Sequence, residues 1–118
     1  MFNTRFTDAP TRQAGELVSH ILLQRGDTDS ALTVTWVQVA PGGQQAPHRH
    51  APEQVYVIVR GTGRMRVKDE VREVGPGDLV LVPPGATHGI ENTGEELLEY
   101  VSAATPAFRV ADHYLDQT

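Results

Sequence analysis

Glycine and proline recur at short intervals along this chain, and this spacing limits its fold more than any other feature of the sequence. The 118 residues include 11 Gly and 8 Pro, many of them in clusters typical of turns. The segments between the clusters are short, rich in β-branched residues and without a helical period. Runs of strand length at this spacing predict an all-β protein, an antiparallel sandwich or barrel. The clusters include Pro41-Gly42-Gly43, Gly61-Thr62-Gly63, Gly75-Pro76-Gly77-Asp78 and Pro83-Pro84-Gly85.

Eight short runs between these turns are the predicted strands. Arg64–Lys68 alternates between charged and apolar residues, which predicts one face in water. Asp78–Val82 is apolar after its first residue, which predicts a strand covered on both faces. Weaker patterns predict arms over residues 1–16 and 104–118, on either side of a barrel over residues 17–103. The predicted strands are Leu17–Leu23, Leu32–Val39, Gln54–Arg60, Arg64–Lys68, Glu70–Val74, Asp78–Val82, Gly89–Glu91 and Leu97–Ser102.

Composition and charge exclude several classes of chemistry and partner. The chain has no cysteine, which excludes disulfides, thiolate nucleophiles and cysteine-based metal sites. Its formal net charge is −5, and no block of Lys and Arg is present, so we expect neither nucleic acid nor a membrane as partner. The apolar runs are far shorter than the roughly 20 residues of a membrane-spanning helix. The first ten residues lack the apolar stretch of a secretory signal, so we expect a cytoplasmic protein.

A closely spaced pair of histidines is the clearest candidate for a functional site. His48 and His50 are two residues apart, so in an extended chain their imidazoles project to the same side. Neutral imidazoles in this arrangement suit a divalent transition metal. Gln54 lies an even number of residues after His50, so in an extended chain its side chain points to the same side. It is therefore favoured as a third ligand over Glu53, which lies an odd number of residues away and points to the other side. Ala51-Pro52 can turn the chain between them, so Glu53 stays as the alternative.

Two segments of the chain resemble the two signature motifs of the cupin superfamily. The first motif, G-x5-H-x-H-x3-E-x6-G, is similar to Gly42–Gly61, and the second, G-x5-P-x-G-x2-H-x3-N, is similar to Gly77–Asn92. Nine of the ten fixed positions agree, and 15 residues separate the motifs. The departure is Gln54, which stands where the motif has Glu. The resemblance implies a small single-domain cupin, a double-stranded β-helix (jelly-roll) barrel with short arms.

The same resemblance implies a metal site formed by His48, His50, Gln54 and His88. An amide oxygen also coordinates metals, and the run of two histidines followed by Glu53-Gln54 resembles cupins in which Gln is the third ligand. Such a site carries no protein negative charge, so the hypothesis follows that it favours anionic ligands such as carboxylates. The donor types accept Mn, Fe, Co, Ni, Cu or Zn alike, and they do not select one of these metals.

Three aromatic residues are candidates for the wall of a substrate pocket. Tyr56 lies two residues after Gln54, so in a strand it points to the same side. Trp36 and Tyr100 lie in neighbouring predicted strands. Each of the three is equally typical of a core or an interface, so that alternative stays open. No residue stands out as a general base.

The resemblance implies a metal-dependent enzyme that acts on a small carboxylated or sugar-derived molecule, as an isomerase, cyclase, lyase or dioxygenase. The alternative is a non-catalytic cupin that binds or senses a metal or a small molecule. No DNA-reading segment accompanies the motifs, which disfavours a one-chain transcription factor. The expected partners are an anionic or sugar-like small molecule and a second copy of the chain. We expect the homodimer to exchange an N-terminal arm, because the sheet edges need cover.

Overall fold

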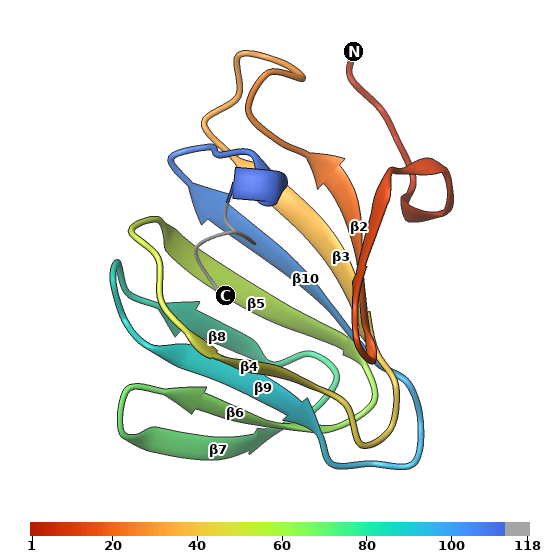
Figure 1. The fold of residues 1–118 in the computed structure, drawn as a ribbon, viewed down its shortest axis with the longest axis vertical. Coiled ribbons are helices and arrows are strands. Elements are labelled where there is room, and N and C mark those ends of the chain that lie inside the picture. Colours follow the sequence, from red (N-terminus) through yellow and green to blue (C-terminus); the bar gives the residue numbers. More distant parts are fainter. Residues whose placement is uncertain (113–118) are drawn as a thin grey trace.

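Two antiparallel sheets face each other in this protein, for which a computed structural model describes residues 1–112 (Figure 1). Six strands form one sheet in the order β1-β2-β3-β10-β5-β8, and four form the other in the order β4-β9-β6-β7. From β3 onward the chain passes repeatedly between the sheets, so residues distant in sequence become neighbours. The elements are η1 (Phe6–Asp8), β1 (Thr11–Ala14), β2 (Leu17–Leu23), β3 (Thr33–Val39), β4 (Gln44–His48), β5 (Glu53–Arg60), β6 (Gly63–Val67), β7 (Glu70–Val74), β8 (Leu79–Val82), β9 (His88–Asn92) and β10 (Leu98–Thr105).

The all-β prediction is confirmed, and all eight predicted strands are present with small shifts at their ends. Two further strands, β1 and β4, lack the signals used to find the others. β1 is short and largely exposed, and β4 contains Pro47 and no alternating apolar residues. β1 lies inside residues 1–16, which were expected to form an arm, and it pairs with β2. The division of the chain into a barrel and two arms stays a prediction. Among residues 1–112, no helix is long and apolar enough to cross a membrane.

The core lies between the two sheets and changes character along β5. Alternate residues of β5 point inward: Ile58 and Tyr56 are almost completely buried, and Gln54 is 7% exposed. The register of β10 brings Tyr100 beside Ile58 and Ser102 beside Tyr56. The core is therefore apolar at one end of the barrel and polar at the other. The polar end holds the candidate site.

The prediction that Asp78–Val82 is covered on both faces is wrong. In the structure β8 is an edge strand of the six-stranded sheet, and only the inward side of this sheet faces the second sheet. Val82 points inward and is 1% exposed, whereas Leu79 and Leu81 point outward and are 62% and 53% exposed. Within residues 1–112, only the inward side of this apolar run is buried. By contrast, the predicted alternation in Arg64–Lys68 is confirmed, because Met65 is buried between two exposed arginines.

Gly61 and Gly77 lie at turns with similar backbone conformations, but the space around them differs, and this difference is testable. Both Gly61 (φ +80°) and Gly77 (φ +92°) have a backbone conformation that strains other residues. A Cβ on Gly61 would also lie 2.5 Å from the carbonyl oxygen of Leu97, whereas one on Gly77 would meet nothing within 4 Å. We expect Gly77→Ala to cost about 1–2 kcal/mol of unfolding free energy. Gly61→Ala should cost more, by at least about 1 kcal/mol, because backbone atoms must also move.

Urea unfolding of the two variants at the same pH measures this difference. Equal losses of stability in Gly61→Ala and Gly77→Ala would show that the close approach to Leu97 has no energetic weight.

Candidate metal centre

Three histidines converge at the polar end of the barrel. His48 ends β4 and lies opposite His88, the first residue of the adjacent strand β9. His50 follows β4 and lies close to both, with ring centroids 5.6 Å from His48 and 5.0 Å from His88. One potential ligand nitrogen of each histidine lies within 4.8 Å of the others. The antiparallel pairing of β4 with β9 thus joins a histidine of the first motif to that of the second.

Hydrogen bonds to the backbone orient two of the imidazoles. Nδ1 of His48 lies 2.8 Å from the carbonyl oxygen of Ala46, and Nδ1 of His88 lies 2.9 Å from that of Ala86. A carbonyl oxygen only accepts, so each Nδ1 carries a proton and each Nε2 keeps a lone pair. Nε2 of His88 is buried and has no hydrogen-bond partner among the described residues. This arrangement, with one ring nitrogen anchored and the other available, is typical of metal-binding histidine.

Burial keeps these histidines neutral. Desolvation lowers the pKa of His88 to about 4, opposed by its hydrogen bond to Ala86 and assisted by the nearby His48. Desolvation also lowers the pKa of His48, against the effect of its bond to Ala46. Both rings are therefore unprotonated near neutral pH, as metal coordination requires.

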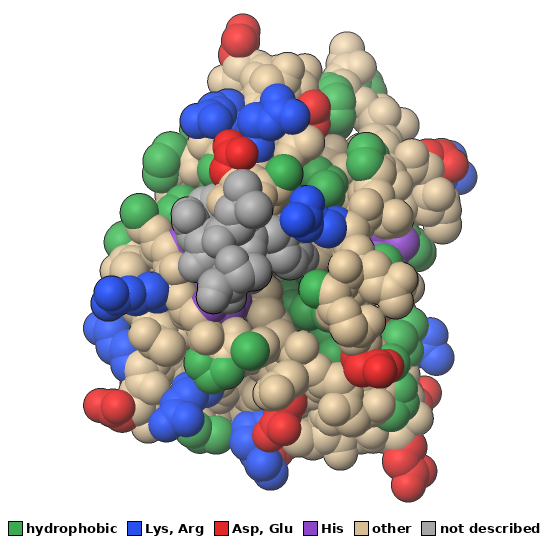
Figure 2. All heavy atoms as spheres, in the orientation of Figure 1, with side chains coloured by type: hydrophobic (Ala, Val, Ile, Leu, Met, Phe, Trp, Pro, Cys, Tyr) green, Lys and Arg blue, Asp and Glu red, His purple; other side chains and the backbone are tan. Residues whose placement is uncertain are grey.

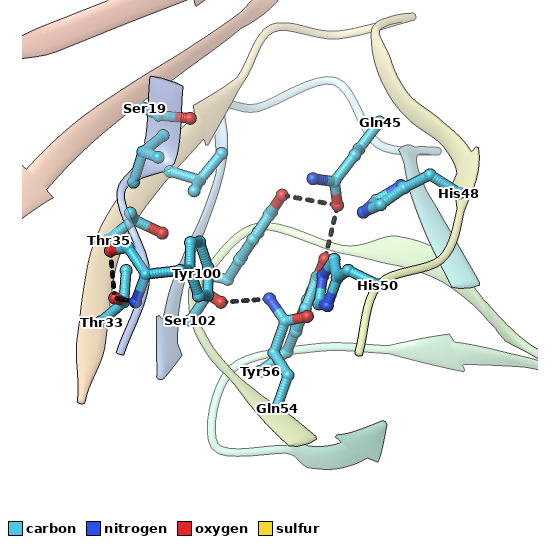
Figure 3. Close-up of a pocket in the computed structure, with 13 residues that line it drawn as sticks. Ser19, Thr33, Thr35, Gln45, His48, His50, Gln54, Tyr56, Tyr100 and Ser102 are labelled. Carbon is cyan, nitrogen blue, oxygen red and sulfur yellow. Dashed lines mark hydrogen bonds between the residues drawn. The ribbon is translucent and has the colours of Figure 1, made fainter. Parts of the chain in front are cut away.

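Gln54 presents its amide oxygen to the same space. Its Nε2 donates a hydrogen bond to Oγ of Ser102 at 2.5 Å, and its Oε1 is buried with no hydrogen-bond partner among residues 1–112. Figure 3 shows the amide nitrogen turned to Ser102 and the oxygen turned toward His50. Glu53 is exposed on the other side of β5. The strand thus places Gln54 at the cavity and Glu53 away from it.

The four side chains fit a divalent transition metal. Unpaired polar atoms such as Nε2 of His88 and Oε1 of Gln54 are costly to bury, by about 1–3 kcal/mol each. Imidazole nitrogen and amide oxygen are donors that such metals accept. A cation among them would satisfy the lone pairs that the described residues leave without a donor.

A small cavity adjoins these donors, and two of the predicted aromatic residues line it. The rings of Tyr56 and Tyr100 stack with centroids 4.7 Å apart. Both hydroxyls donate to Oε1 of Gln45, at 2.5 and 3.4 Å, as Figure 3 shows. The cavity has a volume of about 50 Å³. Its walls are formed by Ser19, Thr33, Thr35, Val37, Gln45, His48, His50, Gln54, Tyr56, Tyr100, Ser102, Phe108 and Val110.

Trp36, the third predicted aromatic residue, lies on the opposite face of the sheet. Its neighbours Thr35 and Val37 line the cavity, so the alternation along β3 turns Trp36 outward. There its ring stacks on Phe6 with a centroid distance of 4.6 Å, and its Nε1 donates to Glu99. The structure therefore does not bring Trp36 together with the histidines.

Sequence reasoning missed two parts of the cavity wall. Gln45 lies on β4, which carries no strand signal, and its two tyrosine partners are distant in sequence. Phe108 and Val110 line the cavity from a segment that follows β10, which we call the C-terminal strap (residues 107–112). Thr33 Oγ1 donates to the carbonyl oxygen of Phe108 and accepts from its amide, both at 2.8 Å. The only sequence signal for the strap was the presence of these apolar residues in an expected arm.

The chain matches the family model of the cupin domain (Cupin_2) over residues 35–104, more than half of its length. A curated relative, the uncharacterised protein MJ1618 of Methanocaldococcus jannaschii, is 33% identical over 75 residues. These residues are 63% of this chain and 60% of the relative, so this chain spans less than two thirds of that protein. A 5-nitrosalicylic acid 1,2-dioxygenase of Bradyrhizobium is 36% identical over 64 residues, 53% of this chain and 31% of that protein.

Other similar proteins include one that binds oxalate. The oxalate-binding protein of Thermotoga maritima is 27% identical over 86 residues, 72% of this chain and 71% of that protein. In fold, the chain is similar to a predicted oxalate decarboxylase of Thermotoga maritima, with a TM-score of 0.82, 21% identity and coverage of 89% and 99%. It is also similar to the polyketide cyclase RemF of Streptomyces resistomycificus, with a TM-score of 0.78, 23% identity and coverage of 89% and 79%. The structural likenesses, at these identities, concern the fold alone.

The lowered pKa of His88 predicts that the metal-free protein loses stability in mild acid. The unfolded chain takes up this proton near pH 6.5, whereas the folded chain takes it up only near pH 4. Stability is therefore full above pH 6.5 and falls as the pH falls from 6.5 toward 4. Between pH 7 and pH 5 we expect a loss of about 2 kcal/mol from this group, and a loss in the same direction from His48. Urea unfolding at both pH values, in wild type and in His88→Gln, measures it; an equal loss in both proteins would contradict this assignment.

The hydrogen bond from Gln54 to Ser102 predicts that Ser102 supports the metal site without being a ligand. In Ser102→Ala the amide loses its acceptor and is free to rotate, so Ni²⁺ affinity should fall by about 10- to 100-fold. Isothermal titration of the folded variants measures this change. Ser19→Ala is the matched control, because it removes a buried cavity hydroxyl two strands away from β10 and should leave the affinity near that of wild type. Unchanged affinity in Ser102→Ala would show that the hydrogen bond does not orient Gln54.

Proposed function

The chain belongs to the cupin family, and from this premise we propose that it is a metal-dependent enzyme that acts on a small carboxylated or sugar-derived molecule. The observation that carries the proposal is the cluster of His48, His50 and His88, of which His48 and His50 line one small cavity together with Gln54. All four are proposed as the metal ligands. Mn, Fe, Co, Ni, Cu and Zn stay as the candidate metals, because nitrogen and amide oxygen donors accept each of them.

The donor set is neutral, and this supports an anionic substrate. A divalent metal held there supplies a Lewis acid whose full formal charge attracts anionic oxygen. The rest of the wall carries no charged side chain: the hydroxyls of Tyr56 and Tyr100 meet at Gln45, whose Oε1 accepts a hydrogen bond from each. Phe108 and Val110, on the strap, contribute apolar side chains to the wall. A cavity of about 50 Å³ supports a small molecule as the ligand.

The reaction class is proposed only as far as the relatives support it. Isomerase, cyclase, lyase and dioxygenase chemistry stay as candidates, and a dioxygenase of Bradyrhizobium is among the relatives that are similar in sequence. A non-catalytic module that binds a small carboxylate is the second candidate. The similarity to the oxalate-binding protein of Thermotoga maritima favours that alternative specifically.

The partners proposed are this small molecule and a second copy of the chain, not nucleic acid. Arg64 forms ion pairs with Glu73 and Glu91, both at 3.1 Å, and Arg72 pairs with Glu70. Basic and acidic side chains are interspersed on the face that Figure 2 shows. Such a mixture supports no phosphate-binding track, which needs a continuous basic surface.

Replacement of Gln54 by Glu tests the importance of the neutral ligand set. The added carboxylate cancels part of the metal charge, so oxalate affinity of the Mn²⁺-loaded protein should fall about tenfold, or about 1.4 kcal/mol. Glu53→Gln is the control, because it changes one charge on the same strand but outside the cavity, and it should leave the affinity within about twofold. Equal or tighter oxalate binding by Gln54→Glu would contradict the charge argument.

Turnover separates the two candidate functions. Wild type purified with its metal is incubated with oxalate, 2-keto acids, hydroxy acids and uronic acids, while product formation and oxygen uptake are recorded. Product without oxygen uptake indicates Lewis-acid chemistry, and product with uptake indicates a dioxygenase. Saturable binding with no product across the series indicates the binding module.

A further inference from the structure

The candidate metal ligands come from both sheets of the barrel. His48 and His88 lie opposite each other on β4 and β9 of the four-stranded sheet, and His50 follows β4. Gln54, in contrast, lies on β5 of the six-stranded sheet. The distance between the histidines and the amide of Gln54 therefore depends on how the two sheets are held together at this end of the barrel.

A side chain of β4 connects the two sheets at this point. Oε1 of Gln45 accepts hydrogen bonds from the hydroxyls of Tyr56 on β5 and Tyr100 on β10, at 2.5 and 3.4 Å. Figure 3 shows this oxygen between the two hydroxyls. Both tyrosines are completely buried, and their strands are paired with each other. One amide of the four-stranded sheet is thus bound to two neighbouring strands of the six-stranded sheet.

An irregularity in β4 brings Gln45 to the same side as the histidines. In a regular strand, residues three positions apart, such as Gln45 and His48, point to opposite faces. On β4, however, Gln45 pairs with Ile90 and His48 pairs with His88, so three steps along β4 correspond to two along β9. The extra residue is a β-bulge, and as a result the side chains of both Gln45 and His48 line the cavity.

The same β-bulge weakens the hold of the ladder on the histidine end of β4. The register of β4 with β9 skips residues 46 and 47, and Pro47 has no N–H to donate. The extra residue of a bulge is left unpaired, so the ladder is locally disrupted. Gln45 is the last regularly paired residue before this interruption. Its side-chain hydrogen bonds therefore constrain β4 where the backbone pairing is interrupted.

We propose that Gln45 is a positioning residue of the metal site. Through Tyr56 and Tyr100 it fixes the histidine end of β4 against the sheet that carries Gln54, and so it sets the separation of the donors. Both lone pairs of its Oε1 are used by the hydroxyls, so Gln45 acts through the tyrosines and not as a ligand. Supporting hydrogen bonds of this kind hold functional groups to within about 0.5 Å of their working geometry. This role rests on the proposed function, because it concerns the metal that the four donors are proposed to hold.

Titration of the metal-free chain with Co²⁺, followed by visible absorption, tests the proposal. The titration gives the affinity, and the absorption bands report the arrangement of the donors around the ion. Gln45→Met keeps the length of the side chain and removes the acceptor. We expect this variant to bind Co²⁺ about tenfold more weakly, at the lower end of the range for residues that support metal ligands, and to shift the absorption bands.

Gln44→Met is the matched control for this substitution. Gln44 precedes Gln45 on β4, but it is exposed and does not line the cavity. The same chemical change at this position should leave both the Co²⁺ affinity and the spectrum as in wild type.

The tyrosine hydroxyls provide a second and milder test. Tyr56→Phe combined with Tyr100→Phe removes both hydrogen-bond donors and keeps the aromatic rings. This double variant should reproduce the loss of affinity and the spectral shift of Gln45→Met. Addition of Gln45→Met to it should weaken binding by less than about twofold more, because the three side chains act as one unit.

Three results would overturn the proposal while leaving the metal site itself in place. The first is wild-type affinity and spectrum in folded Gln45→Met, or in the double tyrosine variant if Gln45→Met does not fold. The second is an equal loss in Gln44→Met, which would assign the effect to β4 as a whole. The third is additive losses for Gln45→Met and the tyrosine pair, which would show that Gln45 does not act through the hydroxyls. Wild type that binds no Co²⁺ contradicts the proposed function, and with it this role of Gln45.

Discussion

The cost of burying polar atoms is the constraint on which this structure depends. Nε2 of His88 and Oε1 of Gln54 are buried without a hydrogen-bond donor among residues 1–112, while the other polar atoms of these side chains are bound to Ala86 and Ser102. Folding must offset that cost from elsewhere in the barrel. The inward positions of β5 show how it does so, because Gln54 at the polar end is followed by Tyr56 and Ile58 toward the apolar end. One strand thus supplies a candidate metal ligand and part of the core that supports it.

Strand alternation also gives the two faces of one sheet different characters. On β5, inward residues face the cavity and the core, and the outward Val57 and Val59 are 36% and 42% exposed. Since the two sets of side chains never share a face, a substitution in one set leaves the packing of the other largely unchanged. The proposed metal site can therefore be altered without disturbing the outward face of the same sheet.

Much of this architecture could be predicted from the sequence, where the signal was local. Turn clusters and β-branched runs located eight strands, and the spacing of two residues between His48 and His50 indicated a shared site. The alternation of side chains along a strand was enough to prefer Gln54 to Glu53 at the cavity. Alternation did not reveal which face of β3 points inward, and Trp36 lies on the outward face. β4 was missed because Pro47 interrupts it, although it carries a histidine of the site. The bridge from Gln45 to Tyr56 and Tyr100, and the strap over the cavity, arise only when distant segments meet.

The attachment of the C-terminal strap separates two parts of the cavity wall. Its hydrogen bonds run to Thr33, Gln24 and the amide of Arg25, all on or next to β2 and β3, and none of these residues is a candidate ligand. The wall that the strap contributes and the candidate donors are thus held in place by different segments of the chain. Substitutions that loosen the strap can therefore reshape one side of the cavity while the hydrogen bonds that orient His48, His88 and Gln54 stay intact.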